Sequence, residues 1–98
     1  METDKMKGSS ANKKHKTAVE GYEDNLQLLC ERIHRMRYDK VEEFYRHAAN
    51  ELRRQAAGDR AKGRFQLTSL LEGAASTAEQ QQHRFARIWA LCKPYMEE

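Results

Sequence analysis

The chain has 98 residues, enough for one small domain, with 18 Lys and Arg residues against 15 Asp and Glu residues. Charged residues make up 34% of the chain and hydrophobic residues 39%, a balance typical of a soluble, highly charged helical protein. No apolar run approaches the ~20 residues that cross a bilayer, and no basic segment precedes an apolar run as in a secretory signal, so we expect a cytoplasmic protein without a membrane partner.

Residues 1–17 form a basic tail with five lysines and two acidic residues, which accounts for the formal net charge of +3. The tail has almost no apolar side chains whose burial would offset the entropy of ordering, and we therefore expect it to be disordered. Residues 18–98 are expected to form a single helical domain. Within it, residues 18–31 carry four acids and no base, whereas residues 32–64 carry ten bases and five acids, so the predicted domain is polarised in charge.

The next predicted element is a long helix over residues 18–57. Apolar residues recur at alternating spacings of three and four from Val19 to Met36, as they do in a helix that packs along one face. The spacing resumes at Val41 and continues to the end of the segment. This regularity predicts a helix of about 40 residues with one continuous apolar stripe.

The phase of this stripe slips by one residue, because position 40 is Lys. Residues 37–40 contain neither Gly nor Pro, so we expect the helix to continue through the slip. The alternative is a break near Tyr38, with Asp39 as the N-cap of a new helix and Glu42 completing a capping box.

Gly58 and Asp59 are the strongest turn signal in the body of the chain. Glycine suits the left-handed position after a helix, and aspartate suits an N-cap. A tight turn at this place returns the chain in the antiparallel direction, into a second helix predicted over residues 60–94. Its stripe keeps one phase across Gly73, which favours a single helix, and Pro94 marks its end.

Two helices that face each other bury one side of each stripe, while further apolar residues widen the apolar surface beyond that seam. We therefore expect this all-α chain to form a long antiparallel helical hairpin that dimerises into a four-helix bundle. The alternative is a monomer that breaks near residues 38 and 75 and folds as four short helices. The residues expected to form the core and the dimer seam are Val19, Leu26, Leu29, Ile33, Phe44, Leu71, Phe85, Ile88 and Trp89.

Cys30 and His34 are weak candidates for metal ligands. They lie four residues apart on one flank of the predicted helix, a spacing that can hold two zinc ligands. A small apolar residue beside a solvated histidine has the same pattern, and we expect no metal site and no cofactor. In the predicted hairpin, Cys92 lies beside about position 25, too far along the axis to imply a disulfide with Cys30.

Catalytic motifs are absent from the sequence. It contains no Gly-rich phosphate loop and no serine in a nucleophile elbow, and the pattern predicts no pair of inward carboxylates. We therefore expect a protein that is not an enzyme.

Basic residues cluster around the predicted turn, with two acids between them. Such a cluster is a candidate patch for RNA, DNA or another anion, although a solvated hairpin tip has the same composition. The leading hypothesis remains a non-enzymatic protein–protein interaction module, an adaptor or scaffold that acts as a small oligomer; nucleic-acid binding and a metal-binding helical bundle follow it. The residues of the basic cluster are Arg53, Arg54, Arg60, Lys62 and Arg64.

Overall fold

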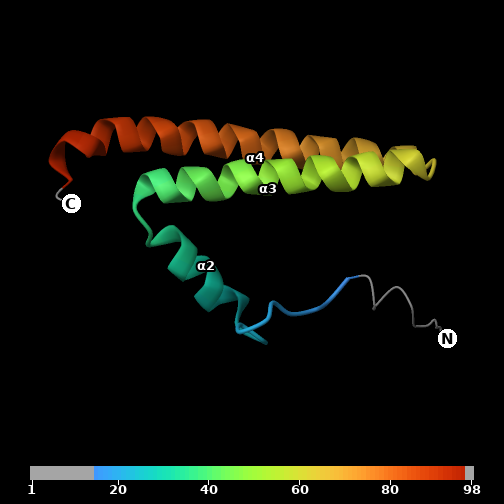
Figure 1. Cartoon of the computed structure of the whole chain (residues 1–98), viewed down its shortest axis with the longest axis horizontal. Helices are drawn as coiled ribbons and strands as arrows, with labels where there is room; N and C mark the ends of the chain where they lie inside the picture. The colour runs from blue at the N-terminus through green and yellow to red at the C-terminus, as the bar shows by residue number, and fades with distance from the viewer. Residues whose placement is uncertain (1–14, 97–98) are drawn as a thin grey trace. The chain divides into compact units, whose positions relative to one another are not determined.

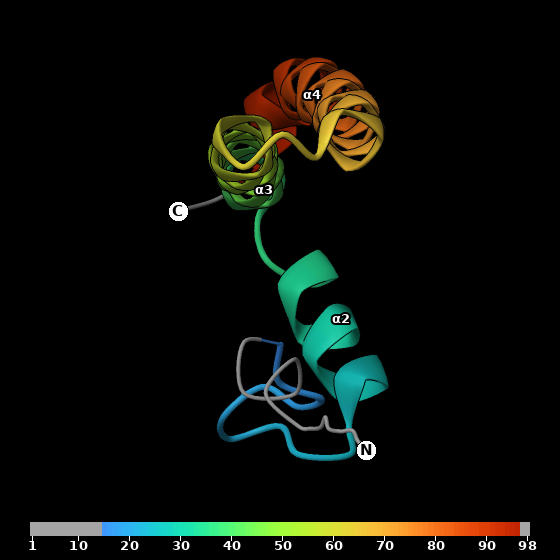
Figure 2. The ribbon, with the colours of Figure 1, turned by 90° about the vertical axis from the view of Figure 1, so that its right-hand side faces the viewer.

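The computed structural model describes residues 15–96, most of which are helical and none of which lie in a strand. Three α-helices follow one another, α2 (Leu26–His34), α3 (Tyr38–Ala61) and α4 (Phe65–Cys92), and the short 3-10 helix η1 (Lys93–Tyr95) comes after them. Figures 1 and 2 show α3 and α4 side by side in opposite directions. The predicted all-α class with two long, packed helices is therefore confirmed.

Two compact units divide the chain after Arg32. In the first unit, residues 18–25 form turns rather than the start of a long helix, because Gly21 and Asp24 have φ angles of +85° and +60°. Asn25 then begins α2, its Oδ1 accepting a hydrogen bond of 3.2 Å from the backbone N–H of Leu28. The predicted disordered tail falls for the most part on residues 1–14, which lie outside the described residues.

The prediction of one continuous helix across the phase slip is wrong, because α2 ends at His34 and α3 begins at Tyr38. Arg37 is the N-cap residue of α3, with an extended ψ of 146°, so Asp39 is not the N-cap of the alternative interpretation either. Instead Asp39 accepts two hydrogen bonds from Arg37, of 2.7 and 2.8 Å, and the guanidinium carbon lies 5.2 Å from the centre of the Trp89 ring. The break therefore lies where Arg37 makes a local ion pair with Asp39 and a tertiary contact with Trp89, and not at a Gly or Pro.

The turn between α3 and α4 lies at Gly63, not at Gly58 as predicted. Gly63 has a φ of +78° and donates its N–H to the carbonyl of Arg60 at 3.0 Å, while the N–H of Arg64 reaches the carbonyl of Asp59 at 2.9 Å. These two bonds form a Schellman cap. Both glycines suit such a cap by residue type, but of the two only Gly63 has a left-handed φ, and Gly58 lies inside α3.

Substitution of the two glycines tests the position of this turn. Gly58 is exposed inside α3, and no atom lies within 4 Å of the place that a Cβ would take, so Gly58→Ala should stabilise the fold by about 0.5–1 kcal/mol. Gly63→Ala should destabilise it by about 1–2 kcal/mol, because L residues disfavour its left-handed φ. Urea unfolding followed by circular dichroism measures both changes, and a turn at Gly58 would exchange their signs.

The second long helix runs without interruption from Phe65 to Cys92, as its single phase predicts, and it ends just before Pro94. The four-short-helix alternative requires a break near position 75, and there it is wrong because Ala75 is fully buried in the middle of α4. The predicted register of the hairpin, centred between Gly58 and Asp59, is also wrong, because the turn lies five residues later than expected.

The fully buried part of the seam between α3 and α4 consists mostly of small side chains. Thr68 is 1% exposed, and its hydroxyl donates to the carbonyl of Arg64 at 2.9 Å, which satisfies this buried polar group. Small residues let two helices approach closely, but they bury little apolar surface for each residue. The hairpin therefore has a thin core, whose fully buried residues are Val41, Ala49, Ala56, Thr68 and Ala75.

Candidate interaction surface

α4 carries two neighbouring stripes of side chains along its length. The first faces α3 and consists of buried or half-buried residues at heptad spacing: Thr68, Leu71, Ala75, Ala78, Gln82, Phe85, Trp89 and Cys92. The second, here called the outer stripe, lies beside the first at the same spacing of three and four: Leu67, Leu70, Ala74, Thr77, Gln81, Arg84, Ile88 and Leu91. The hairpin buries the first stripe and leaves much of the outer stripe in solvent.

The outer stripe exposes large apolar side chains at both of its ends. Leu67 is 43% exposed and Leu70 is 66% exposed near the start of α4, and Leu91 is 76% exposed near its end. Ile88, one turn before Leu91, is half-buried. The middle of the stripe is small or polar, so the apolar character is concentrated in two patches separated by several helical turns.

The predicted seam residues lie in the first unit, at the end of α2, on α3 and in both stripes of α4. Val19 and Leu26 are exposed at 44% and 62%, whereas the other seven are half-buried. Leu70 and Leu91 were not among the predicted seam residues, although each lies three residues from an apolar residue of the outer stripe. The signal that could have identified them was a second set of residues at heptad spacing, displaced by one residue from the first. The half-buried seam residues are Leu29, Ile33, Phe44, Leu71, Phe85, Ile88 and Trp89.

Aromatic rings cluster where α3 begins and α4 ends. The Tyr45 and Phe85 rings stack at 5.5 Å with an interplanar angle of 14°, and the Tyr38 ring lies 6.2 Å from Phe85. His34, at the end of α2, shares a hydrogen bond of 2.6 Å between its Nε2 and the Tyr45 hydroxyl. Its ring also makes an edge contact with Phe85 at 6.5 Å. This cluster joins three helical segments of the second unit.

The same hydrogen bond bears on the metal candidates. The Nε2 of His34 is engaged by Tyr45, and Cys30 is exposed one turn earlier on α2. Within residues 15–96, no group of three or more His, Cys, Asp or Glu side chains lies close enough together to hold a metal ion. The structure therefore adds no third ligand to the pair that the sequence suggested.

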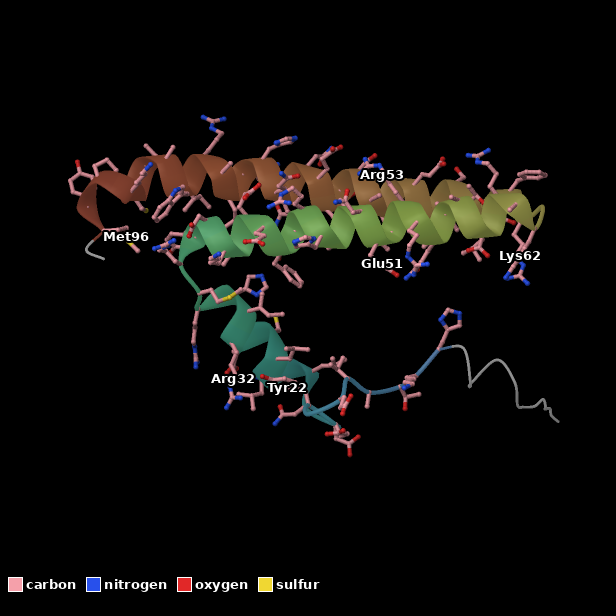
Figure 3. All side chains as sticks on the ribbon, viewed as in Figure 1. Tyr22, Arg32, Glu51, Arg53, Lys62 and Met96 are labelled. Atoms are coloured by element: carbon pink, nitrogen blue, oxygen red, sulfur yellow. The ribbon has the colours of Figure 1, made fainter. Side chains whose placement is uncertain are left out.

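Acidic residues form ion pairs with the arginines of the predicted basic cluster. Arg53 contacts Glu79 at 3.0 Å and Arg60 contacts Glu72 at 2.8 Å, and both pairs join α3 to α4. Arg64 contacts Asp59 at 3.3 Å. Figure 3 shows Lys62 at the tip of the hairpin, and no ion pair within the described range includes it.

The remaining arginine of the cluster forms the closest ion pair. Arg54 donates to Glu51 through Nε at 3.0 Å, and this hydrogen bond, with a second from Gln55, lowers the pKa of Glu51 to about 2. The pKa of Asp39 is also lowered, chiefly by its hydrogen bond with Arg37. The ion pairs of the four arginines of the cluster reduce its positive field, although each of these largely exposed pairs contributes little to stability.

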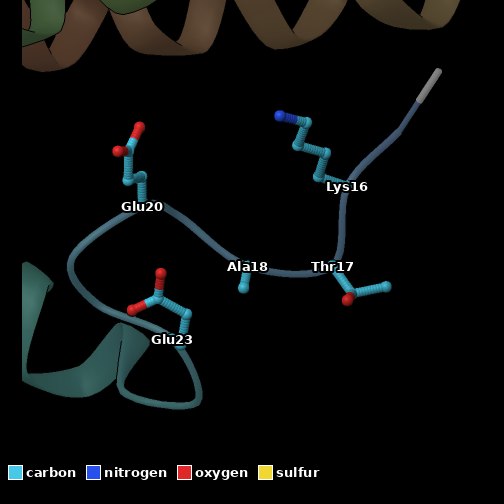
Figure 4. A pocket seen from close by; sticks show the side chains of 5 residues that line it. All are labelled: Lys16, Thr17, Ala18, Glu20 and Glu23. Atoms are coloured by element: carbon cyan, nitrogen blue, oxygen red, sulfur yellow. The ribbon is translucent and has the colours of Figure 1, made fainter. Parts of the chain in front are cut away.

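A shallow hollow of about 640 Å³ lies within the first unit. Figure 4 shows Glu20 and Glu23 toward one end of this hollow and Lys16 toward the other. Thr17 and Ala18 complete its lining, and all of these side chains belong to the turn segment before α2. It offers two carboxylates and one ammonium on an exposed segment, without the apolar walls of a small-molecule site.

Comparison with protein-family models, with curated proteins and with solved structures gave no match to this chain. Within residues 15–96, no helix combines the length and the hydropathy that crossing a membrane requires. The surfaces of the chain itself are therefore the guide to its function.

Proposed function

We propose that this protein is a non-enzymatic helical interaction module, an adaptor or scaffold that acts as a small oligomer. The observation that carries the proposal is the outer stripe of α4. Its three exposed leucines lie beside a seam whose fully buried residues on α4 are the small side chains Thr68 and Ala75. An exposed apolar stripe on a highly charged chain is typical of a helix that packs against a further helix.

The free energy available from covering the stripe is substantial. Burying a fully exposed leucine contributes roughly 1.5–3 kcal/mol, so covering Leu67, Leu70 and Leu91, which are already part-covered, contributes on the order of 3–5 kcal/mol. A domain of this size has a total stability of about 5–15 kcal/mol. Association through the outer stripe would therefore supply a large part of the stability of the protein.

The experiment is size-exclusion chromatography with light scattering on protein purified without nuclease treatment. The proposal predicts a mass of about 23 kDa, twice the chain mass of 11.5 kDa, with the absorbance ratio of pure protein. A mass of 11.5 kDa at every concentration of a 100-fold dilution series, with no other protein captured, would contradict the proposal.

Nucleic-acid binding at the hairpin tip is the second candidate. Lys62 supports it, because no carboxylate pairs with its ammonium within the described residues, and exposed arginine pairs can exchange a carboxylate for a phosphate. The same chromatography distinguishes this function: co-eluting nucleic acid raises the absorbance at 260 nm, and high salt removes it. The arginine ion pairs make this the weaker of the two proposals.

A further inference from the structure

The outer stripe has a pattern that selects its partner and the direction of that partner. We infer that a second copy of this chain covers it, with the two α4 helices antiparallel and Leu70 of one copy against Ile88 of the other. The inference rests on the proposed function, and it adds the identity of the partner and the geometry of the contact.

Self-complementarity is the first argument. In an antiparallel pair of heptad stripes, facing positions have residue numbers with a constant sum, which is 158 for a two-fold axis at Glu79. Four distinct pairs then cover the whole stripe, two of them entirely apolar at the ends and two small or polar in the middle. These pairs are Leu67 with Leu91, Leu70 with Ile88, Ala74 with Arg84, and Thr77 with Gln81.

Charge is the second argument, and it separates the antiparallel dimer from a parallel one. Arg84 is the single charged residue of the outer stripe. A parallel two-fold would place it against its own copy, and like charges that face each other across an interface are unfavourable. In the antiparallel pair Arg84 faces Ala74, whose small side chain leaves room for the aliphatic part of the arginine.

The area of the surface is the third argument. The 28 residues of α4 extend about 42 Å at 1.5 Å per residue, and a two-helix hairpin is about 20 Å wide. One side of the hairpin thus offers on the order of 800 Å², the contribution of each partner to a stable protein–protein interface of ordinary size. A second copy offers a surface of the same length and pattern, so no part of the stripe is left over.

Cysteine cross-linking tests this geometry. The native thiols are first replaced in the full chain, by Cys30→Ser and Cys92→Ala, and Leu70→Cys and Ile88→Cys are then introduced singly and together. Within one chain these positions are 18 residues apart, about 27 Å along the helix, so a disulfide between them must join two chains. Mild oxidation is followed by denaturing electrophoresis without reductant, and light scattering records the mass before oxidation.

The antiparallel dimer predicts a covalent dimer for the double variant and at least ten times less of it for either single variant. His83→Cys, on the exposed side of α4 away from the stripe, is the matched control and should not cross-link. Efficient cross-linking of Leu70→Cys alone would show a parallel dimer and overturn the inference. A dimeric mass without a bridge between positions 70 and 88 would overturn the geometry alone, whereas a monomeric mass before any substitution would overturn the proposed function as well.

Discussion

Replacement of Phe85 by alanine is expected to lower the free energy of unfolding by about 3 kcal/mol. Phe85 is half-buried, stacks on Tyr45 and contacts the rings of Tyr38 and His34, so its removal opens the cluster at the end of the hairpin. Complete burial would make the cost about 3–5 kcal/mol, and the remaining exposure of the ring places this site toward the lower end. Urea unfolding at one fixed protein concentration measures the change, because association contributes to the apparent stability.

Tyr95→Ala is the matched control for this substitution. Tyr95 is another large aromatic residue near the end of α4, but it is 85% exposed. Its removal should change the free energy of unfolding by less than about 0.5 kcal/mol. Equal effects of the two substitutions would contradict the assignment of the aromatic cluster to the core.

Enlargement of Ala56 to leucine is expected to destabilise the hairpin by about 2–3 kcal/mol. Ala56 is 1% exposed in the seam, and its carbonyl lies 3.4 Å from the hydroxyl of Thr68 across the hairpin. A leucine would push the two helices apart along the part of the seam that small residues bring close, and overpacking of this kind costs about 1–3 kcal/mol. The measurement is the midpoint of thermal or urea unfolding.

The adjacent residue provides the control. Ala57→Leu adds the same atoms to an exposed position of the same helix, and helix propensity differs little between the two residue types. We expect a change below about 0.5 kcal/mol. A tolerated leucine at position 56 together with a harmful one at position 57 would mean that a different face of α3, rotated by about 100°, packs against α4.

Sequence reasoning predicted the helical class and α4 well, because hydrophobic periodicity over a long segment is the strongest local signal. The unbroken phase across Gly73 predicted one helix, and Pro94 predicted its end. Sequence reasoning failed between His34 and Tyr38, where no residue breaks a helix by its own preference. At that break Arg37 contacts Asp39 and Trp89, and Trp89 is more than 50 residues away in the sequence, so local residue preferences do not include this contact.

The turn and the core were missed for related reasons. Gly58 and Gly63 are equally good local signals, and the choice between them depends on which pairing of α3 with α4 is better. The fully buried residues are mostly alanines, which hydrophobic patterning weights less than leucine or phenylalanine. Of the four seam residues predicted on α4, Leu71, Phe85 and Trp89 lie in the stripe that faces α3, and Ile88 lies in the outer stripe. Leu70 and Leu91, the most exposed residues of the outer stripe, were not among them.

The most direct test of the central proposal is the mass of the chain in solution when the outer stripe is altered. Sedimentation equilibrium should give about 23 kDa, twice 11.5 kDa, for the unaltered chain. The double variant Leu70→Ser and Leu91→Ser should give 11.5 kDa. Its helicity should be retained at a concentration where the monomer is folded. The control pair Gln80→Ser and His83→Ser, on exposed positions outside the stripe, should remain dimeric. A mass that is the same for all three proteins would contradict association through the outer stripe.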